Sequence, residues 1–282
     1  ASRAAHSSIM QAARAMDCDV AFVEVDDRGR MTGDATRRCV ESLSPHDRER
    51  VFAVVATGGT TNVGVVDDID GVGDVAVAIN AWFHVDAAYG GAAMCTSSRR
   101  NLFRGIEKSD SFIVDPHKWL FAPFDSCALL YRDPRMGRAA HTQHAEYLDA
   151  LHTKDDWNPS DYAHHLSRRP RGLPLWFSLA THGTRAYGEA VEHTLRVTME
   201  GAEIIRSAPH LELLMEPELS VLVFRRTGWD HDRYEEWCER TLMQGAAFVV
   251  PTSWQGSTCL RLCIVNPETT PADIALIVEM LK

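Results

Sequence analysis

The sequence predicts an α/β protein with a mostly parallel sheet, followed by a smaller α+β domain with antiparallel strands. Short apolar runs alternate with helical segments through the first half of the chain, a pattern typical of βαβ units. After a long polar stretch the apolar runs follow an order that suits antiparallel strands. We place the larger domain at residues 1–178 and the smaller one at residues 179–282.

The larger domain is expected to alternate helices and buried strands. The segment at 7–16 has the pattern of a helix, and VAFVEV at 20–25 that of a buried strand. In chain order, the further elements expected are a helix at 34–43, a strand at 51–57, a helix at 71–80 and strands at 81–85, 111–114 and 127–132. Each strand run is short and almost wholly apolar, as a strand covered on both faces requires.

The smaller domain follows a polar stretch at 137–165 that is rich in His and Asp and lacks periodicity. Such a stretch is expected to form a long loop, of the kind that is usually functional or disordered in a compact domain. In chain order, the remaining elements expected are a helix at 174–206, a strand at 221–226, a helix at 231–244, strands at 247–250 and 259–265, and a helix from Pro271. We see no internal repeat.

Composition excludes several classes of protein. The 282 residues are 45% hydrophobic and 24% charged, which is ordinary for a globular chain. Lys and Arg number 29 against 39 Asp and Glu, a net charge of -10, so a phosphate-backbone binder is not expected. No apolar run approaches the roughly 18 residues of a membrane helix, so neither a nucleic-acid nor a membrane partner is expected.

The seven cysteines are odd in number and scattered, which argues against a disulfide framework and for a cytoplasmic location. Only Cys259 and Cys263 lie close together, within a strand-like run. Because no second pair of ligands accompanies them, we expect core packing rather than a zinc site.

Polar and small residues follow three of the predicted strands. GGTTNVG follows the strand at 51–57, DAAYGG the strand at 81–85, and DPHKW the strand at 111–114. Because ligands bind beyond the carboxyl ends of parallel strands, we expect these segments to meet. The residues brought together would be Thr60, Thr61, Asp86, Ala87, Ala88, Asp115, His117 and Lys118.

One lysine and one carboxylate with small residues between them suit pyridoxal-phosphate chemistry. A lysine partly removed from water, such as Lys118, can attack a carbonyl as an amine nucleophile. Pyridoxal phosphate supplies such a carbonyl and needs an acidic partner at its ring nitrogen, a role for Asp86. Ala88, two residues further on the same face, leaves room for a flat ring.

Each of these residues also has a structural interpretation. Lys118 could be an ordinary lysine at a strand end, and Asp86 could cap the turn that follows it. His6, near a helix start, could be a cap or a surface residue. GGTTNVG is as consistent with a turn whose glycines adopt positive φ as with a phosphate contact.

Two further sets of side chains lie in and after the polar loop. Its histidines lack a fixed pattern of acidic or cysteine partners, so we expect no metal site. Three arginines could clamp a carboxylate or anchor the loop, and the pattern does not decide between these roles: Arg168, Arg169 and Arg171.

Five stretches together carry a family resemblance. In chain order they are AHSS, VVATGGTTNVGVVDDID, WFHVDAAYGG, GIEKSDSF and DPHKWLF. In this order and spacing they resemble the pyridoxal-phosphate-dependent group II amino-acid decarboxylases, which include the aromatic-amino-acid, glutamate, histidine and diaminobutyrate decarboxylases. The pairing of HVDAAYGG with DPHKW is the specific part, and the likeness continues to the C-terminal strands. The resemblance implies a fold-type I architecture and a homodimer.

The resemblance implies roles for five cofactor-binding residues. Lys118 would hold pyridoxal phosphate covalently, Asp86 would pair with its ring nitrogen, and His6 would stack on the ring. Thr61 and Asp115 match positions that contact the cofactor.

Two further residues are assigned by the same resemblance. His117, beside the lysine, would touch the phosphate or the substrate carboxylate. Tyr147, in the polar loop, resembles a mobile-loop tyrosine that returns a proton to the substrate's Cα. With Lys118 and His6, Tyr147 completes the expected catalytic set.

The chain departs from the family pattern in two ways. Several relatives have Asn at the position of Asp115, and a carboxylate there would repel a phosphate, so we expect an indirect contact or a protonated acid. Family members also have a long segment before AHSS. We expect the chain to lack this N-terminal part and, by itself, to bind the cofactor weakly.

The activity implied is decarboxylation of an L-amino acid to the corresponding amine and carbon dioxide. Another pyridoxal-phosphate lyase reaction or an aldehyde-forming decarboxylation on the same scaffold is one alternative. A non-catalytic fragment or pseudoenzyme that only dimerises is the other. The sequence does not identify the substrate, although aromatic amino acids are slightly favoured because they are common in the family.

Overall fold

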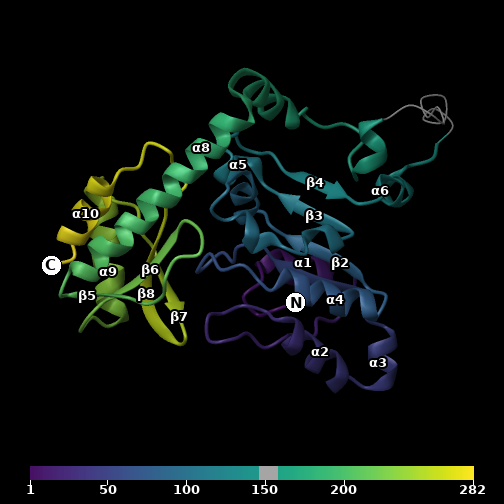
Figure 1. Ribbon diagram of the computed structural model, residues 1–282, viewed down its shortest axis with the longest axis horizontal. Helices are drawn as coiled ribbons and strands as arrows, with labels where there is room; N and C mark the ends of the chain where they lie inside the picture. The colour runs from purple at the N-terminus through teal and green to yellow at the C-terminus, as the bar shows by residue number, and fades with distance from the viewer. Residues whose placement is uncertain (146–157) are drawn as a thin grey trace.

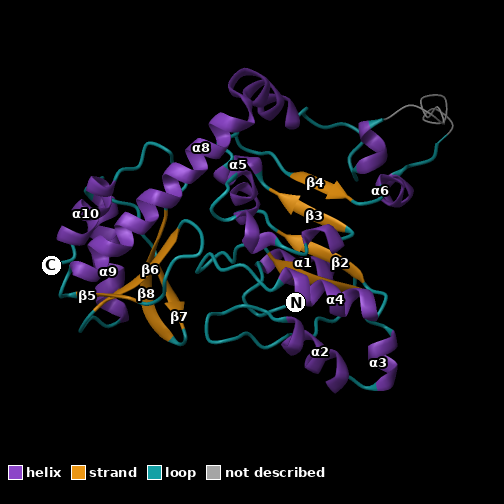
Figure 2. Ribbon diagram, viewed as in Figure 1, coloured by secondary structure: helices purple, strands orange, loops and turns teal. Residues whose placement is uncertain are grey.

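The computed structural model describes residues 1–145 and 158–282 and contains two sheets (Figures 1 and 2). The first sheet has the order β1-β2-β3-β4. Its strands are β1 (Ala53–Thr57), β2 (Trp82–Asp86), β3 (Ser111–Val114) and β4 (Ala128–Tyr131). The first three strands run parallel and β4 pairs antiparallel with β3. The predicted α/β class with a mostly parallel sheet is therefore confirmed.

Helices and short 3-10 turns precede, connect and follow these strands. In chain order they are α1 (Ser7–Ala15), α2 (Gly33–Ser42), α3 (Pro45–Glu49), α4 (Ile69–Ala78), η1 (Gly90–Cys95), η2 (Arg100–Phe103), η3 (Ile106–Lys108), α5 (Pro116–Trp119), α6 (Pro134–His141) and η4 (Pro159–Tyr162). Asp68 ties two helix starts together, because its carboxylate accepts from the Gly71 amide of α4 and the Gly33 amide of α2, both at 3.1 Å. This placement satisfies backbone donors that a helix start leaves unpaired.

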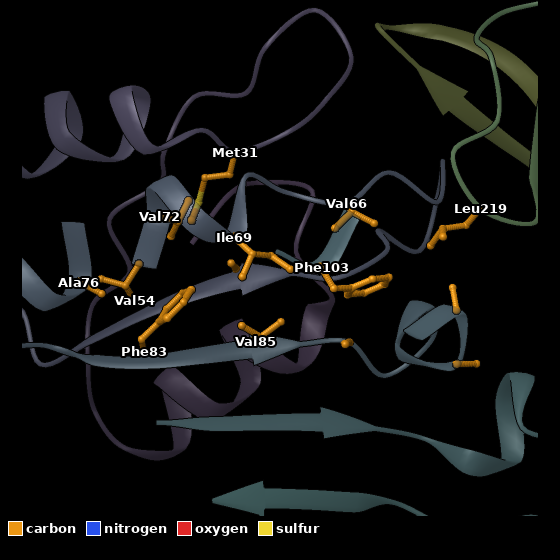
Figure 3. Packing of buried hydrophobic residues seen from close by; sticks show 14 of the residues in the cluster. Met31, Val54, Val66, Ile69, Val72, Ala76, Phe83, Val85, Phe103 and Leu219 are labelled. Carbon is orange, nitrogen blue, oxygen red and sulfur yellow. The ribbon is translucent and has the colours of Figure 1, made fainter. Parts of the chain in front are cut away.

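The main core lies between β1, β2 and α4 (Figure 3). Phe83 and Val85 of β2 are 1% and 0% exposed, and they pack with Val54 of β1 and Val72 of α4. Burial of each large apolar side chain contributes about 1.5–3 kcal/mol. Because side chains alternate along a strand, the same register turns Asp86 to the opposite face from Phe83 and Val85.

The second sheet has the order β5-β6-β8-β7 and is antiparallel throughout. Its strands are β5 (Leu211–Leu213), β6 (Val221–Arg226), β7 (Pro251–Trp254) and β8 (Ser257–Cys263). Three helices accompany it: α8 (Gly172–Ser207), α9 (His231–Met243) and α10 (Pro271–Glu279). Figure 1 shows α8 running from the region of the first sheet to the second. The helix is interrupted at Gly183, where φ is 76°.

Several expected elements differ from those observed. Residues 20–25 form no strand but only single bridges, Ser2 with Val23 and Val25 with Met31. The chain turns back at Asp26, whose carboxylate accepts from two backbone amides and pairs with Arg30, and Val25 is left 40% exposed. This segment is therefore not the buried strand that its apolar run predicts.

The last strands also differ from the expectation. Residues 247–250 are not a strand, because Phe248 is 77% exposed and β7 begins only at Pro251. Of the two neighbouring cysteines, Cys259 is buried in a core cluster whereas Cys263 is exposed. The described residues contain no group of three or more His, Cys, Asp or Glu that could hold a metal ion. Nor does any described helix combine the length and apolar character of a membrane span.

Polar contacts join segments next to the first sheet to residues in and before the second sheet. Glu218 accepts from the Val66 amide at 2.9 Å and pairs with Arg28 at 2.5 Å. Arg261 of β8 donates to the Thr61 carbonyl at 2.6 Å, and Arg99 donates to the Glu218 carbonyl at 2.8 Å. The loop after β1 is therefore held from both halves of the chain.

Glycine is required where the segments after β1 and β2 meet. A Cβ on Gly90 would lie 2.1 Å from the Gly58 carbonyl oxygen and 2.7 Å from Leu219. Gly59 has φ of +113°, in the region that favours glycine. These two glycines of GGTT and YGG thus permit a close backbone approach, which supports the structural interpretation of the turn.

Replacing Gly90 with Ala should lower the melting temperature, because the new Cβ cannot fit without a backbone shift. Overpacking of this kind costs about 1–3 kcal/mol. Gly172→Ala is the control, since nothing lies within 4 Å of its added Cβ. Equal melting temperatures for the two variants, followed by circular dichroism, would contradict the close packing.

Asp67 anchors the loop before α2 to β1. Its carboxylate accepts from the amides of Met31 and Thr57, both at 2.7 Å, and the residue is 2% exposed. Burial raises the pKa of Asp67 from 3.8 to about 7, against the opposing effect of these two hydrogen bonds. The folded protein therefore binds this proton more tightly than the unfolded chain does.

A group with a raised folded pKa makes the protein less stable as the pH rises through the interval between the unfolded and folded values. The free energy of unfolding of the wild type, relative to Asp67→Asn, should fall between about pH 4 and 7 by at most about 1.4 kcal/mol per pH unit. Above about pH 8 the difference should be constant. Urea titrations of both proteins across this range measure it, and a rising difference would refute the raised pKa.

Candidate functional site

The ends of the three parallel strands lie together at one edge of the sheet. Asp86 is the register partner of Thr57 on one side and of Ile113 on the other. Beyond the strands, the Gly58 amide donates to the Asp86 carbonyl at 2.7 Å, and the Asp115 amide donates to the Ala88 carbonyl at 2.9 Å. The segments that follow β1, β2 and β3 are thus hydrogen-bonded side by side, as expected.

Lys118 lies in the short helix α5, directly after β3. Asp115 precedes this helix and Pro116 begins it. The Lys118 amide donates to the Asp115 carbonyl at 2.9 Å, and the Lys118 Nζ is 3.1 Å from the Asp115 Oδ2. The Lys118 side chain is 39% exposed, against 14% for Asp115. The amine is therefore held at a fixed place by a mostly buried carboxylate while it remains accessible.

Asp86 is 9% exposed at the end of β2. Its Oδ1 accepts from the Ala88 amide at 3.2 Å, so it caps the turn that follows it. Within the described residues the carboxylate has no ion-pair partner. A buried carboxylate without a cation is costly, so capping one amide is a weak reason for its burial.

Cys127, which sequence reasoning did not select, belongs to the same group of side chains. Burial is the main cause that raises the pKa of the Cys127 thiol to about 11, and the charge and hydrogen bond of Asp115 contribute to the same rise. The charge of Asp86 acts in the same direction, and that of Lys118 opposes it. The pKa of the thiol therefore depends on both carboxylates and on the lysine, so these four side chains lie close together.

His84 was also not selected, although it lies two residues before Asp86 on the same face of β2. Its Nδ1 is 2.8 Å from the Ser111 Oγ, which also accepts from the Trp82 indole at 2.8 Å. Burial lowers the pKa of His84, and the charge of Asp86 opposes this effect. A neutral His84 leaves the negative charge of Asp86 uncompensated.

The other expected site residues make different contacts. His117 has its Nδ1 2.5 Å from the Ser126 carbonyl oxygen, and its ring meets Phe124 edge-on. Thr61 is exposed, and its carbonyl accepts from Arg261. His6 is exposed and caps α1, since its Nδ1 accepts from the Ser8 amide at 3.2 Å. Tyr147 lies outside the described residues.

The structure assigns an anchoring role to the three arginines whose role the sequence left open. Arg169 and Arg171 both pair with Asp125, at 3.2 Å and 2.9 Å, and Arg168 donates to the Pro159 carbonyl at 3.1 Å. Asp125 belongs to the loop between α5 and β4, two residues before Cys127. The carboxylate that Arg169 and Arg171 clamp is therefore the chain's own.

Comparisons with known proteins show the family to which this chain belongs. Residues 1–227 match the model of the pyridoxal-dependent decarboxylase conserved domain. The chain is 32% identical over 275 residues to the aromatic-L-amino-acid decarboxylase of Drosophila lebanonensis, covering 96% of this chain and 66% of that protein. It is 32% identical over 208 residues to the L-2,4-diaminobutyrate decarboxylase of Acinetobacter baumannii, covering 73% of this chain and 40% of that protein.

Among solved structures, mouse CSAD superimposes with a TM-score of 0.84 at 27% identity, covering 99% of this chain and 62% of that one. The chain spans between about half and two thirds of the length of the aromatic-amino-acid decarboxylases that it matches. The shared part contains both sheets and all three strand-end segments.

Because Asp115 raises the pKa of the Cys127 thiol, Asp115→Asn should increase the rate at which Cys127 is alkylated. Removal of the negative charge leaves more thiolate at a given pH, and the thiolate is the reactive form. Iodoacetamide labelling at pH 8, followed by peptide mass spectrometry, measures the rate.

Cys95 is the internal control, because it is exposed and Asp115 is not among the groups that shift its pKa. Its labelling rate should be the same in both proteins. A Cys127 rate that is unchanged or lower in Asp115→Asn would contradict the contact.

Proposed function

Because the chain belongs to the pyridoxal-dependent decarboxylase family, we propose that its protein converts an L-amino acid to the corresponding amine and carbon dioxide, with pyridoxal phosphate as cofactor. The observation that carries this proposal is the arrangement at the strand ends. An accessible lysine amine and a buried carboxylate without a cation partner in the described residues follow neighbouring strands.

The donor set fits this cofactor. Asp86 needs a cation, and a protonated ring nitrogen is one. Lys118 provides an amine for the aldehyde, and Ala88 is a small neighbour. When bound, pyridoxal phosphate supplies a ring that accepts the electron pair of the bond broken at the substrate's Cα. Asp86 would hold the proton on the ring nitrogen, which keeps the ring a strong electron acceptor.

Asp115 prepares Lys118 for its role. An ammonium group must lose a proton before it can attack a carbonyl. The Asp115 Oδ2, 3.1 Å from the Lys118 Nζ, is an acceptor within reach of that proton. The same contact orients the amine. Contact of Asp115 with the cofactor would then be indirect, through the lysine.

We also propose that the protein is a cytoplasmic homodimer. All seven cysteines are free thiols, which suits a reducing compartment. The start of α8 exposes large apolar side chains, with Trp176 at 60%, Phe177 at 57% and Leu173 at 47%. Such side chains are typical of a surface that a partner covers. The L-amino-acid side chain recognised stays undetermined, with aromatic substrates favoured.

The decisive experiment is borohydride reduction of the intact protein with pyridoxal phosphate, followed by peptide mass spectrometry. The cofactor should be fixed to Lys118 in the wild type and not in Lys118→Arg, whose guanidinium keeps the charge but cannot react with the aldehyde. An amine-release assay over a panel of L-amino acids should detect an amine product from the wild type. The rate of its formation should be at least about a hundredfold lower in Asp86→Asn, as for removal of a main electrostatic partner.

The alternatives predict other results. Release of an aldehyde instead of an amine would indicate the oxidative reaction on the same scaffold. No fixation at Lys118 would indicate a non-catalytic protein and would refute the proposal.

A further inference from the structure

Two aromatic rings connect the segments that carry Asp86 and Lys118. Tyr89 lies three residues after Asp86, and Trp119 directly follows Lys118. The two rings are stacked, with centroids 5.1 Å apart and planes 14° from parallel. Together with backbone hydrogen bonds such as that from the Asp115 amide to the Ala88 carbonyl, this stack joins the two segments.

Both rings are fixed by hydrogen bonds to the C-terminal half of the chain. The Trp119 indole, which is 0% exposed, donates to the Thr194 Oγ1 of α8 at 3.0 Å. Thr194 in turn donates to the Val191 carbonyl at 2.8 Å. The indole hydrogen of Trp119 and the hydroxyl hydrogen of Thr194 therefore both have acceptors, so the indole has one favoured position.

The Tyr89 ring is fixed in the same manner. Its hydroxyl is 2.5 Å from the Ser220 Oγ, and it accepts from the Ser220 amide at 3.0 Å. Ser220 directly precedes β6 of the second sheet. The hydroxyl can thus accept one hydrogen and donate one, which fixes the tilt of the ring over Trp119.

We propose that the Tyr89–Trp119 stack is a positioning pair that sets the separation of the Asp86 carboxylate from the Lys118 amine. The inference rests on the proposed function. Neither ring touches the reacting atoms in this role. The pair acts through the Asp86 and Lys118 side chains, and hydrogen bonds hold its two rings to α8 and to the residue before β6.

The test compares Tyr89→Leu, which removes the stack, with Tyr89→Phe, which keeps the ring and loses only the Ser220 contacts. Tyr234→Leu and Tyr234→Phe are matched controls. Tyr234 is 1% exposed, its hydroxyl accepts from the Arg226 amide at 2.8 Å, and its ring meets Trp229 edge-on in the hydrophobic cluster formed by α8, α9, α10 and the second sheet. Trp119→Phe and Trp237→Phe form a second pair, because the buried Trp237 indole likewise donates to one acceptor, the Met280 carbonyl at 2.8 Å.

The readouts are the dissociation constant of pyridoxal phosphate and the visible circular dichroism of the bound cofactor, measured on intact, folded proteins. Tyr89→Leu should weaken binding about tenfold and change the dichroism, since an aromatic pair is worth about that factor. Tyr89→Phe should retain most of the affinity and the wild-type sign. The Tyr234 and Trp237 variants should have lower melting temperatures, but their dissociation constants for pyridoxal phosphate and their visible circular dichroism should match the wild type.

Wild-type affinity and dichroism in Tyr89→Leu would overturn the inference. An equal loss in Tyr234→Leu would also overturn it, because the effect would then follow stability alone. If borohydride fixed no cofactor to Lys118 in the wild type, both the proposed function and the inference would be refuted. Fixation in the wild type together with either of the two Leu-variant results above would refute the inference alone.

Discussion

The register of β2 between β1 and β3 is the constraint on which the site depends. Side chains alternate along a strand, so a slip of one residue would turn Asp86 into the core and Phe83 out of it. Phe83 and Val85 are almost completely buried against β1 and α4, which makes such a slip costly. The apolar core thereby determines the face on which the carboxylate lies, although no core residue touches it.

The described part of the C-terminal half contributes to the site, although the charged side chains described at the strand ends, Asp86, Asp115 and Lys118, all precede it. Ser220 and Thr194 fix the rings next to Asp86 and Lys118, Arg261 holds the loop after β1, and Glu218 binds the amide of Val66. These contacts join residues more than 70 positions apart. The site's geometry is consequently a property of both sheets together.

Sequence patterns predicted the elements whose cause is local. The strands near 51–57, 81–85 and 111–114 combine a continuous apolar run with a polar or glycine-rich end, and all three were found. The runs at 20–25 and 247–250 look similar but are not strands, because pairing depends on distant partners that composition does not reveal. For the same reason the roles of Cys127 and of Arg171, which pairs with Asp125 46 residues away, could not be predicted.

The charges around Lys118 explain how an aspartate can stand at position 115, close to the expected phosphate. A carboxylate near a phosphate is repelled when it is free, but the charge of Asp115 is balanced by the Lys118 ammonium at 3.1 Å. Burial and both carboxylates keep the Cys127 thiol protonated, and burial keeps His84 neutral. Of these groups, Asp86 alone retains an unbalanced charge. A buried anion is retained against its desolvation cost only where a cation pairs with it. At the end of β2, a cationic ring would therefore be stabilised by its interaction with the Asp86 carboxylate.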